Sequence, residues 1–135
     1  MKTIEAIIER AEDGTYSVFC KNEIFSGMGP TISSAKANME EQMQFYKKTA
    51  LEQGFKYPEF LDEEYEIIYD IDAPSLMRYY VNKGIFTLSS LEKITGINQK
   101  QLWSYLNGTS PRKAQAKRIE SGLRDLRSDL NAIFA

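Results

Sequence analysis

The sequence predicts an α+β protein: a small antiparallel-type sheet with one packing helix, followed by an all-helical module. Three observations lead to this prediction. Residues 1–72 show short alternating apolar patterns and one long helical pattern. Residues 73–135 show only helical patterns, separated by glycine turns. The charge also changes sign, since residues 1–72 hold 7 Lys and Arg against 15 Asp and Glu (net −8) and residues 73–135 hold 10 against 4 (net +6).

The composition excludes several kinds of chemistry. The 135 residues, of which 42% are hydrophobic, match one average domain or two small ones. The chain has no histidine, which removes Ser-His-Asp triads, Cys-His dyads, His-ligated zinc and histidine pH switches. Its single cysteine, Cys20, excludes an internal disulfide and a multi-cysteine metal site. We therefore expect no metal and no cofactor.

Neither a membrane span nor a signal peptide is expected. No apolar run approaches the ~20 residues that cross a bilayer. The start of the chain, residues 1–5, lacks an apolar core and a small-residue cleavage site. The expected location is the cytoplasm.

The first module begins with a predicted hairpin. Residues 3–9 and 15–20 alternate between apolar and polar positions, and the Asp-Gly pair at 13–14 between them is a hairpin turn signal. A third short strand is expected over 24–28 and a fourth over 65–71. The resulting order is strand, strand, strand, helix, strand.

The helix of this module is predicted between Thr31 or Ser33, either of which can cap it, and Gly54, which stops it. Its apolar positions recur at steps of four, four, three and four residues. They are Ala35, Met39, Met43, Tyr46 and Ala50.

Two stretches of this module, residues 7–18 in the hairpin and residues 29–35 entering the helix, resemble the N-terminal domain of HicB antitoxins. The family usually has a Pro-Gly-Cys segment before the third strand, which is missing here, and a Glu-Ala pair where this chain has Ser34-Ala35. The resemblance implies a partial RNase H-like fold without nuclease activity. It also implies a partner, because HicA toxins, which these domains bind, are small basic RNA-cleaving proteins.

The second module is expected to hold four helices, opened by capping residues or prolines and closed by glycine turns. The residues that mark these boundaries are, in chain order, Pro74, Gly84, Thr87 or Ser89, Gly96, Asn98, Asn107-Gly108 and Ser110-Pro111.

Residues 87–108 resemble the helix-turn-helix of phage repressors of the Cro/C1 type. One position departs from that class, since Leu88 stands where many members have Gln. HicB proteins often carry such a DNA-binding domain, so the two resemblances support one another. The positions that match the class are Gly96, Ile97, Gln99, Leu102 and Asn107-Gly108.

The resemblance places the helix after residue 98 in the DNA major groove. Gln99 can bond adenine and Lys100 can reach guanine acceptors, and Ser104, about one turn further along, can touch a base or a thymine methyl. Trp103 has two open interpretations, a contact with the DNA backbone or packing on the module's first helix. The expected backbone contacts are Asn107, Ser110, Arg112 and Lys113, with further positive charge from Lys117 and Arg118. The alternative is that these residues form only a solvated polar surface.

Towards the C-terminus, apolar residues recur with the spacing of a helix-pairing seam. The first part is expected to pack on the helical core. The later part, Leu126, Leu130 and Ile133, is expected to form a dimer contact, with folding back onto the same chain as the alternative. A dimer would present two reading helices about one DNA turn apart, as a palindromic site requires.

These features predict an antitoxin of HicA/HicB type. The acidic N-terminal domain (1–72) would neutralise an RNA-cleaving toxin, and the C-terminal domain (73–135) would repress the operon as a dimer. The alternative is a stand-alone regulator whose N-terminal domain binds a ligand or another protein. A nuclease using Asp70 and Asp72 is a third class, but solvated carboxylates at a strand edge explain these residues better, so no enzyme is expected.

Overall fold

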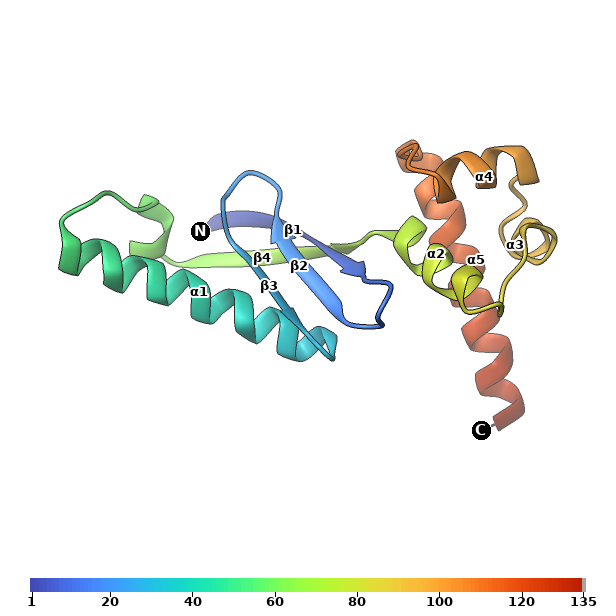
Figure 1. Cartoon of the computed structure of the whole chain (residues 1–135), viewed down its shortest axis with the longest axis horizontal. Coiled ribbons are helices and arrows are strands. Elements are labelled where there is room, and N and C mark those ends of the chain that lie inside the picture. The colour runs from blue at the N-terminus through green and yellow to red at the C-terminus, as the bar shows by residue number, and fades with distance from the viewer. Residues whose placement is uncertain (135) are drawn as a thin grey trace. The chain divides into compact units, whose positions relative to one another are not determined.

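The computed structural model describes residues 1–134 and divides the chain into two compact units, Met1–Asp72 and a second that begins at Ala73 (Figure 1). The boundary lies where the net charge changes sign. The protein is α+β, as the sequence predicts, with strands only in the first of these units.

Unit 1 is built on four strands, β1 (Lys2–Arg10), β2 (Tyr16–Cys20), β3 (Ser26–Gly29) and β4 (Tyr65–Ile71), in the spatial order β3-β2-β1-β4. The first two pairings are antiparallel, but β4 runs parallel to β1. The expectation of an antiparallel-type sheet is therefore wrong at β4. A helix connects β3 to β4, and this long crossover returns the chain beside β1 in the same direction as β1, which a hairpin turn cannot do.

The helix of this crossover is α1 (Ile32–Gln53), and the 3-10 helix η1 (Glu59–Asp62) follows it. Of the two expected caps, Thr31 is the one used, because its hydroxyl accepts the Ser34 N–H at 3.0 Å. α1 lies along one face of the sheet, where it contacts β2 and β3 (Figure 1). The buried core between helix and sheet consists of Ile4, Ala6, Ile8, Val18, Cys20, Phe25, Ala35, Met39, Met43, Phe60 and Leu61.

Glycine sets the closest approach between helix and sheet. A Cβ atom on Gly27 of β3 would lie 2.4 Å from the backbone nitrogen of Met39. No larger residue fits there without moving α1. β3 begins at Ser26, two residues later than expected, although the Phe25 carbonyl still accepts the Cys20 N–H at 3.0 Å and the Phe25 ring lies in the core.

Unit 2 contains α2 (Ala73–Asn82), α3 (Leu88–Thr95), α4 (Gln99–Leu106) and α5 (Lys113–Phe134). Helices α2, α3 and α4 follow the expected order. The last helix begins later than expected, since Ser110-Pro111 precede it and the first helical turn is closed by a bond from Ala116 N–H to the Arg112 carbonyl. The core of this unit is formed by Ala73, Met77, Leu91, Ile97, Leu102, Tyr105 and Ile119.

Among residues 1–134, no helix combines the length and the apolar character that crossing a membrane requires.

Candidate nucleic-acid interface

A tightly bonded turn joins α3 to α4. Gly96 ends α3 with φ of 72°, a left-handed conformation that glycine adopts without strain. The hydroxyl of Thr95 donates to the Leu91 carbonyl at 2.7 Å and accepts the Ile97 N–H at 3.1 Å. Ile97 is buried in the core of unit 2. These contacts fix the direction in which α4 leaves the turn.

Helix α4 is held on one side only. Asn98 caps it by accepting the Gln101 N–H at 2.8 Å, as the sequence predicts. Leu102 and Tyr105 are buried, and the Arg78 Nε of α2 donates to the Leu106 carbonyl at 3.1 Å. The side of α4 away from Leu102 does not pack on the core of unit 2.

The outward side of α4 carries Lys100, Trp103, Ser104 and Asn107, which recur at helical spacing. Trp103 is 57% exposed and does not belong to the core of unit 2. Gln99 is exposed at the first turn, where its amide contacts the Glu92 carboxylate at 3.4 Å.

Asn107 has a structural contact that the sequence interpretation did not include. Its side-chain amide donates to the Trp103 carbonyl at 2.8 Å, and its backbone N–H donates to the same atom at 3.0 Å. The side chain thereby closes the C-terminal end of α4. One of its two amide hydrogens is used, so a phosphate could receive only the other.

A hollow of about 610 Å³ lies between α4 and the start of α5. It brings together three of the residues expected at the DNA, namely Ser104, Ser110 and Arg112. It also includes residues that the sequence analysis missed. They are Gln101, Thr109 and Gln115. The helical spacing between Gln101 and Ser104 could have indicated that Gln101 belongs to this site. Gln115 could not be found in this way, because only the fold places it beside them.

Arg118 differs from the other cations of α5. Its guanidinium donates to the Gly96 carbonyl at 2.7 Å and to the Gln115 amide oxygen at 3.1 Å, and Gln115 donates to Gln101 at 3.1 Å. Arg118 therefore ties α5 to the α3–α4 turn. Arg112, Lys113 and Lys117 are exposed.

The apolar seam of α5 leaves the core partway along the helix. Ile119 is buried and Leu123 packs on the core of unit 2. Leu126 is half-buried, Leu130 is 44% exposed and Ile133 is 66% exposed. The residues expected at a dimer contact are thus accessible along the last turns of the helix.

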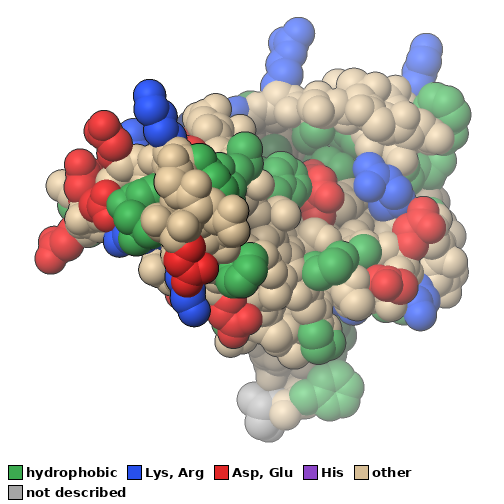
Figure 2. Space-filling model, turned by 60° about the vertical axis from the view of Figure 1, so that its left-hand side comes forward, with side chains coloured by type: hydrophobic (Ala, Val, Ile, Leu, Met, Phe, Trp, Pro, Cys, Tyr) green, Lys and Arg blue, Asp and Glu red, His purple; other side chains and the backbone are tan. Residues whose placement is uncertain are grey.

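Unit 1 has an apolar groove beside α1. Its volume is about 460 Å³, and exposed hydrophobic residues from three segments line it, Ile24, Phe45 and Phe55. On the face drawn in Figure 2, hydrophobic side chains reach the surface beside acidic ones.

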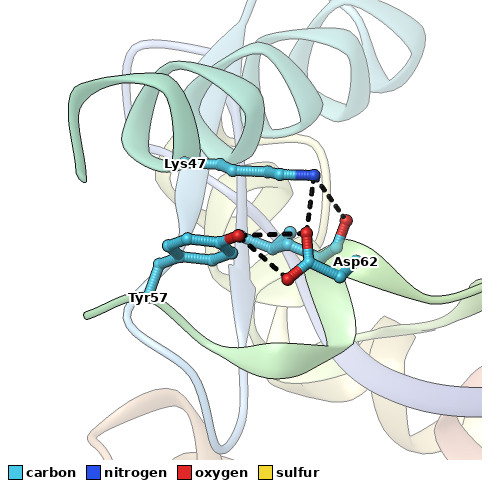
Figure 3. Close-up of polar contacts among 4 residues, drawn as sticks. Lys47, Tyr57 and Asp62 are labelled. Carbon is cyan, nitrogen blue, oxygen red and sulfur yellow. Dashed lines mark hydrogen bonds and ion pairs between the residues drawn. The ribbon is translucent and has the colours of Figure 1, made fainter. Parts of the chain in front are cut away.

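One wall of this groove belongs to the segment after α1, which an ion pair fixes in place (Figure 3). The Lys47 Nζ lies 2.8 Å from Asp62 Oδ1, and the Tyr57 hydroxyl donates to the same carboxylate at 2.9 Å. Hydrogen bonds from Lys47 and Tyr57 lower the pKa of Asp62 below its usual value. The hydrogen bond from Lys47 to Asp62 raises the pKa of Lys47.

Two further groups of unit 1, Asp70 and Cys20, were candidates for chemistry. Asp70 is exposed on β4, and no group of three or more potential metal ligands occurs among residues 1–134. Cys20 is buried, and this burial raises the pKa of its thiol, which disfavours the reactive thiolate.

Comparison of the chain with models of protein families, with curated proteins and with solved structures finds no match.

Proposed function

We propose that this protein is a DNA-binding repressor of the HicB antitoxin type. Helices α3 and α4 act as a helix-turn-helix, and α4 enters the major groove. The observation that carries this proposal is the outward side of α4, where Gln99, Lys100 and Ser104 are not held in the core. Gln99 bonds adenine, Lys100 bonds guanine, and Ser104 touches a base or a thymine methyl, while Trp103 contacts the DNA backbone.

The start of α5 positions the protein on the DNA backbone. Ser110 and Arg112 line the hollow next to Ser104, and Lys113 follows at the first turn of the helix. Backbone N–H groups at a helix N-terminus and cationic side chains both favour a phosphate. Contacts of this kind set the register of α4 without reading sequence.

The exposed part of the α5 seam pairs two copies. Leu126, Leu130 and Ile133 of each copy pack together, which gives the dimer one reading helix for each half of a palindromic site.

The acidic unit holds a protein partner. Its net charge of −8 favours a basic protein and speeds the encounter with it. In the HicB resemblance this partner is a HicA-like toxin, whose RNA-cleaving site the antitoxin covers in the cytoplasm. The protein itself then has no catalytic role.

The test of DNA recognition is selection from a library of random duplexes by the full-length protein. We expect enrichment of an inverted repeat with half-site centres about 10 base pairs apart. Lys100→Ala should lose this enrichment, whereas Lys83→Ala, an exposed cation of the same unit outside α4, should keep it. Equal retention of unrelated duplexes would refute sequence-specific binding.

The partner is tested separately. Co-purification of the chain with a small basic protein encoded by the adjacent gene supports the antitoxin. Specific DNA binding with no such protein supports a stand-alone regulator whose N-terminal unit binds a different ligand or protein.

A further inference from the structure

The two edges of the unit 1 sheet differ. At one edge, β3 is four residues long, contains two glycines and is contacted by α1. The backbone N–H of Met28 donates to the side-chain oxygen of Asn38 at 3.0 Å, so a helix side chain takes a bond that an added strand would otherwise make. This edge is protected against strand addition.

At the other edge, β4 offers a longer and continuous strand. It has seven residues with no proline or glycine, and it pairs with β1 along its whole length. In the part of the chain that the structure describes, β4 ends the strand order, and none of its residues is fully buried. Its outer row of backbone N–H and C=O groups is therefore available for pairing.

The charge around β4 selects the strand that can pair there. Residues 62–72 contain six carboxylates and no Lys or Arg. Two β4 edges from two copies would place like charges opposite one another, which disfavours pairing between copies. A strand with Lys or Arg side chains places opposite charges together instead.

The side chains of β4 also indicate which side-chain pattern a partner strand would need. Ile67 pairs with the buried Ile4, whereas Glu66 accepts a hydrogen bond from Thr3 Oγ1 at 3.3 Å on the sheet face away from α1. Glu66, Ile68 and Asp70 alternate along that open face, and Ile68 is 48% exposed. A complementary strand would carry cations near Glu66 and Asp70 and an apolar residue near Ile68.

We propose that β4 binds a cationic β-strand of a partner protein, which extends the sheet of unit 1 to five strands. This inference deepens the proposed function and rests on it, because it assigns the surface of the acidic unit that holds the basic partner. Backbone hydrogen bonds supply affinity, and the alternation of Glu66, Ile68 and Asp70 supplies selectivity.

The test uses the full-length protein and a short blocked peptide in which Lys, Val and Lys occupy every second position, so that all three lie on one face of the strand. Binding is followed by amide chemical shifts and by hydrogen exchange. We expect slower exchange at the backbone amides of Tyr65, Ile67, Tyr69 and Ile71, which point away from β1. The same peptide with alternate backbone amides methylated keeps its charge but loses donors, and it should bind at least about tenfold more weakly, since each lost bond costs about 1 kcal/mol.

A double variant tests the side-chain pattern. Glu66→Gln with Asp70→Asn should weaken peptide binding at least about tenfold, since both lost carboxylates lie on the sheet face that carries the cations of the bound strand. Glu41→Gln with Glu52→Gln removes the same charge from exposed positions of α1 and should change binding by no more than about twofold.

Equal binding of the methylated peptide, protection outside β4, equal effects of the two double variants, or no binding would each overturn the proposal. None of these measurements contains DNA or a toxin. Failure of strand addition is thus distinguished from failure of the proposed function, which the duplex selection and the co-purification report.

Discussion

At the scale of single residues, substitutions of Gln99 and Lys113 are expected to change DNA binding in different ways. Gln99 stands at the first turn of α4, where it can reach a base edge, while Lys113 stands at the start of α5. Gln99→Ala should reduce the preference for the selected duplex over a mismatched one by about 1–3 kcal/mol. Lys113→Ala should weaken binding to both duplexes similarly. Titrations of both variants against both duplexes measure this, and an unchanged preference in Gln99→Ala would remove Gln99 from the reading surface.

Asp62 gives a pH-dependent prediction for unit 1. Its pKa is lowered in the folded protein by hydrogen bonds from Lys47 and Tyr57, so its contribution to stability is present above the usual value of 3.8 and is lost as the pH falls through the lowered pKa. Asp62→Asn should therefore lower the melting temperature at about pH 7. The difference from the wild type should be smaller at about pH 3. Thermal unfolding at both pH values checks this, and Glu63→Gln, at an exposed neighbour, is the control.

At the scale of elements, the packing of α5 on α3 depends on Gly122. A Cβ atom at this position would lie 2.5 Å from the Ile94 carbonyl oxygen. Alanine favours a helix over glycine by about 1 kcal/mol, but the steric conflict with backbone costs about 1–3 kcal/mol. Gly122→Ala should thus lower the free energy of unfolding, whereas Ser121→Ala, on the exposed side of the same turn, should not. Denaturant unfolding of the two variants decides between these expectations.

The exposed end of α5 is the element expected to join two copies. Leu130→Asp with Ile133→Asp places charges in the seam and should shift the protein from dimer to monomer, because an unpaired buried charge costs several kcal/mol. Ser121→Asp with Ser128→Asp adds the same charge to the helix side opposite the seam and should leave the dimer intact. Sedimentation at equal concentrations compares them. A wild-type monomer would rule out the seam as a dimer contact.

At the scale of the whole molecule, the separation of charge matters more than the total. The chain has a net charge of −2, yet unit 2 alone carries +6. Binding to DNA should therefore weaken steeply as salt rises, with a log-log slope of about −0.9 for each phosphate contacted. Lys113→Ala should reduce the steepness by about 0.9, while Lys48→Ala, an exposed cation of unit 1, should leave it unchanged. Affinities at several salt concentrations give both slopes.

The elements that local chemistry specifies were predicted well. The strand over 65–71 agrees with the structure at both ends, and Gly54, Gly96 and Asn98 bound helices where expected. These features depend on neighbouring residues alone, through alternation, capping hydrogen bonds and left-handed glycines. The errors have a different origin. The start of α5 depends on how residues 107–112 connect two packed helices, and the parallel direction of β4 depends on which strand it meets.

The candidate site also has features that local sequence predicts and features that it does not. The exposed positions of Gln99 and Lys100 and the half-buried position of Ser104 follow from helical spacing, since Leu102 and Tyr105 fix the buried side of α4. Two contacts were not predicted. The Asn107 side chain donates to the Trp103 carbonyl. Arg118 donates to the Gly96 carbonyl, and this bond joins positions 22 residues apart.

By itself, the sequence determined the segments, their caps and the opposite charges of the two units, because all three follow from the order of residues along the chain. The tertiary structure alone decided which strand edge is covered by α1 and which is open, which cations are used to hold helices together, and where the seam of α5 leaves the core. The physical reason is that these properties belong to atoms brought together from distant parts of the chain, and their burial and hydrogen bonding exist only once both packing partners are in place.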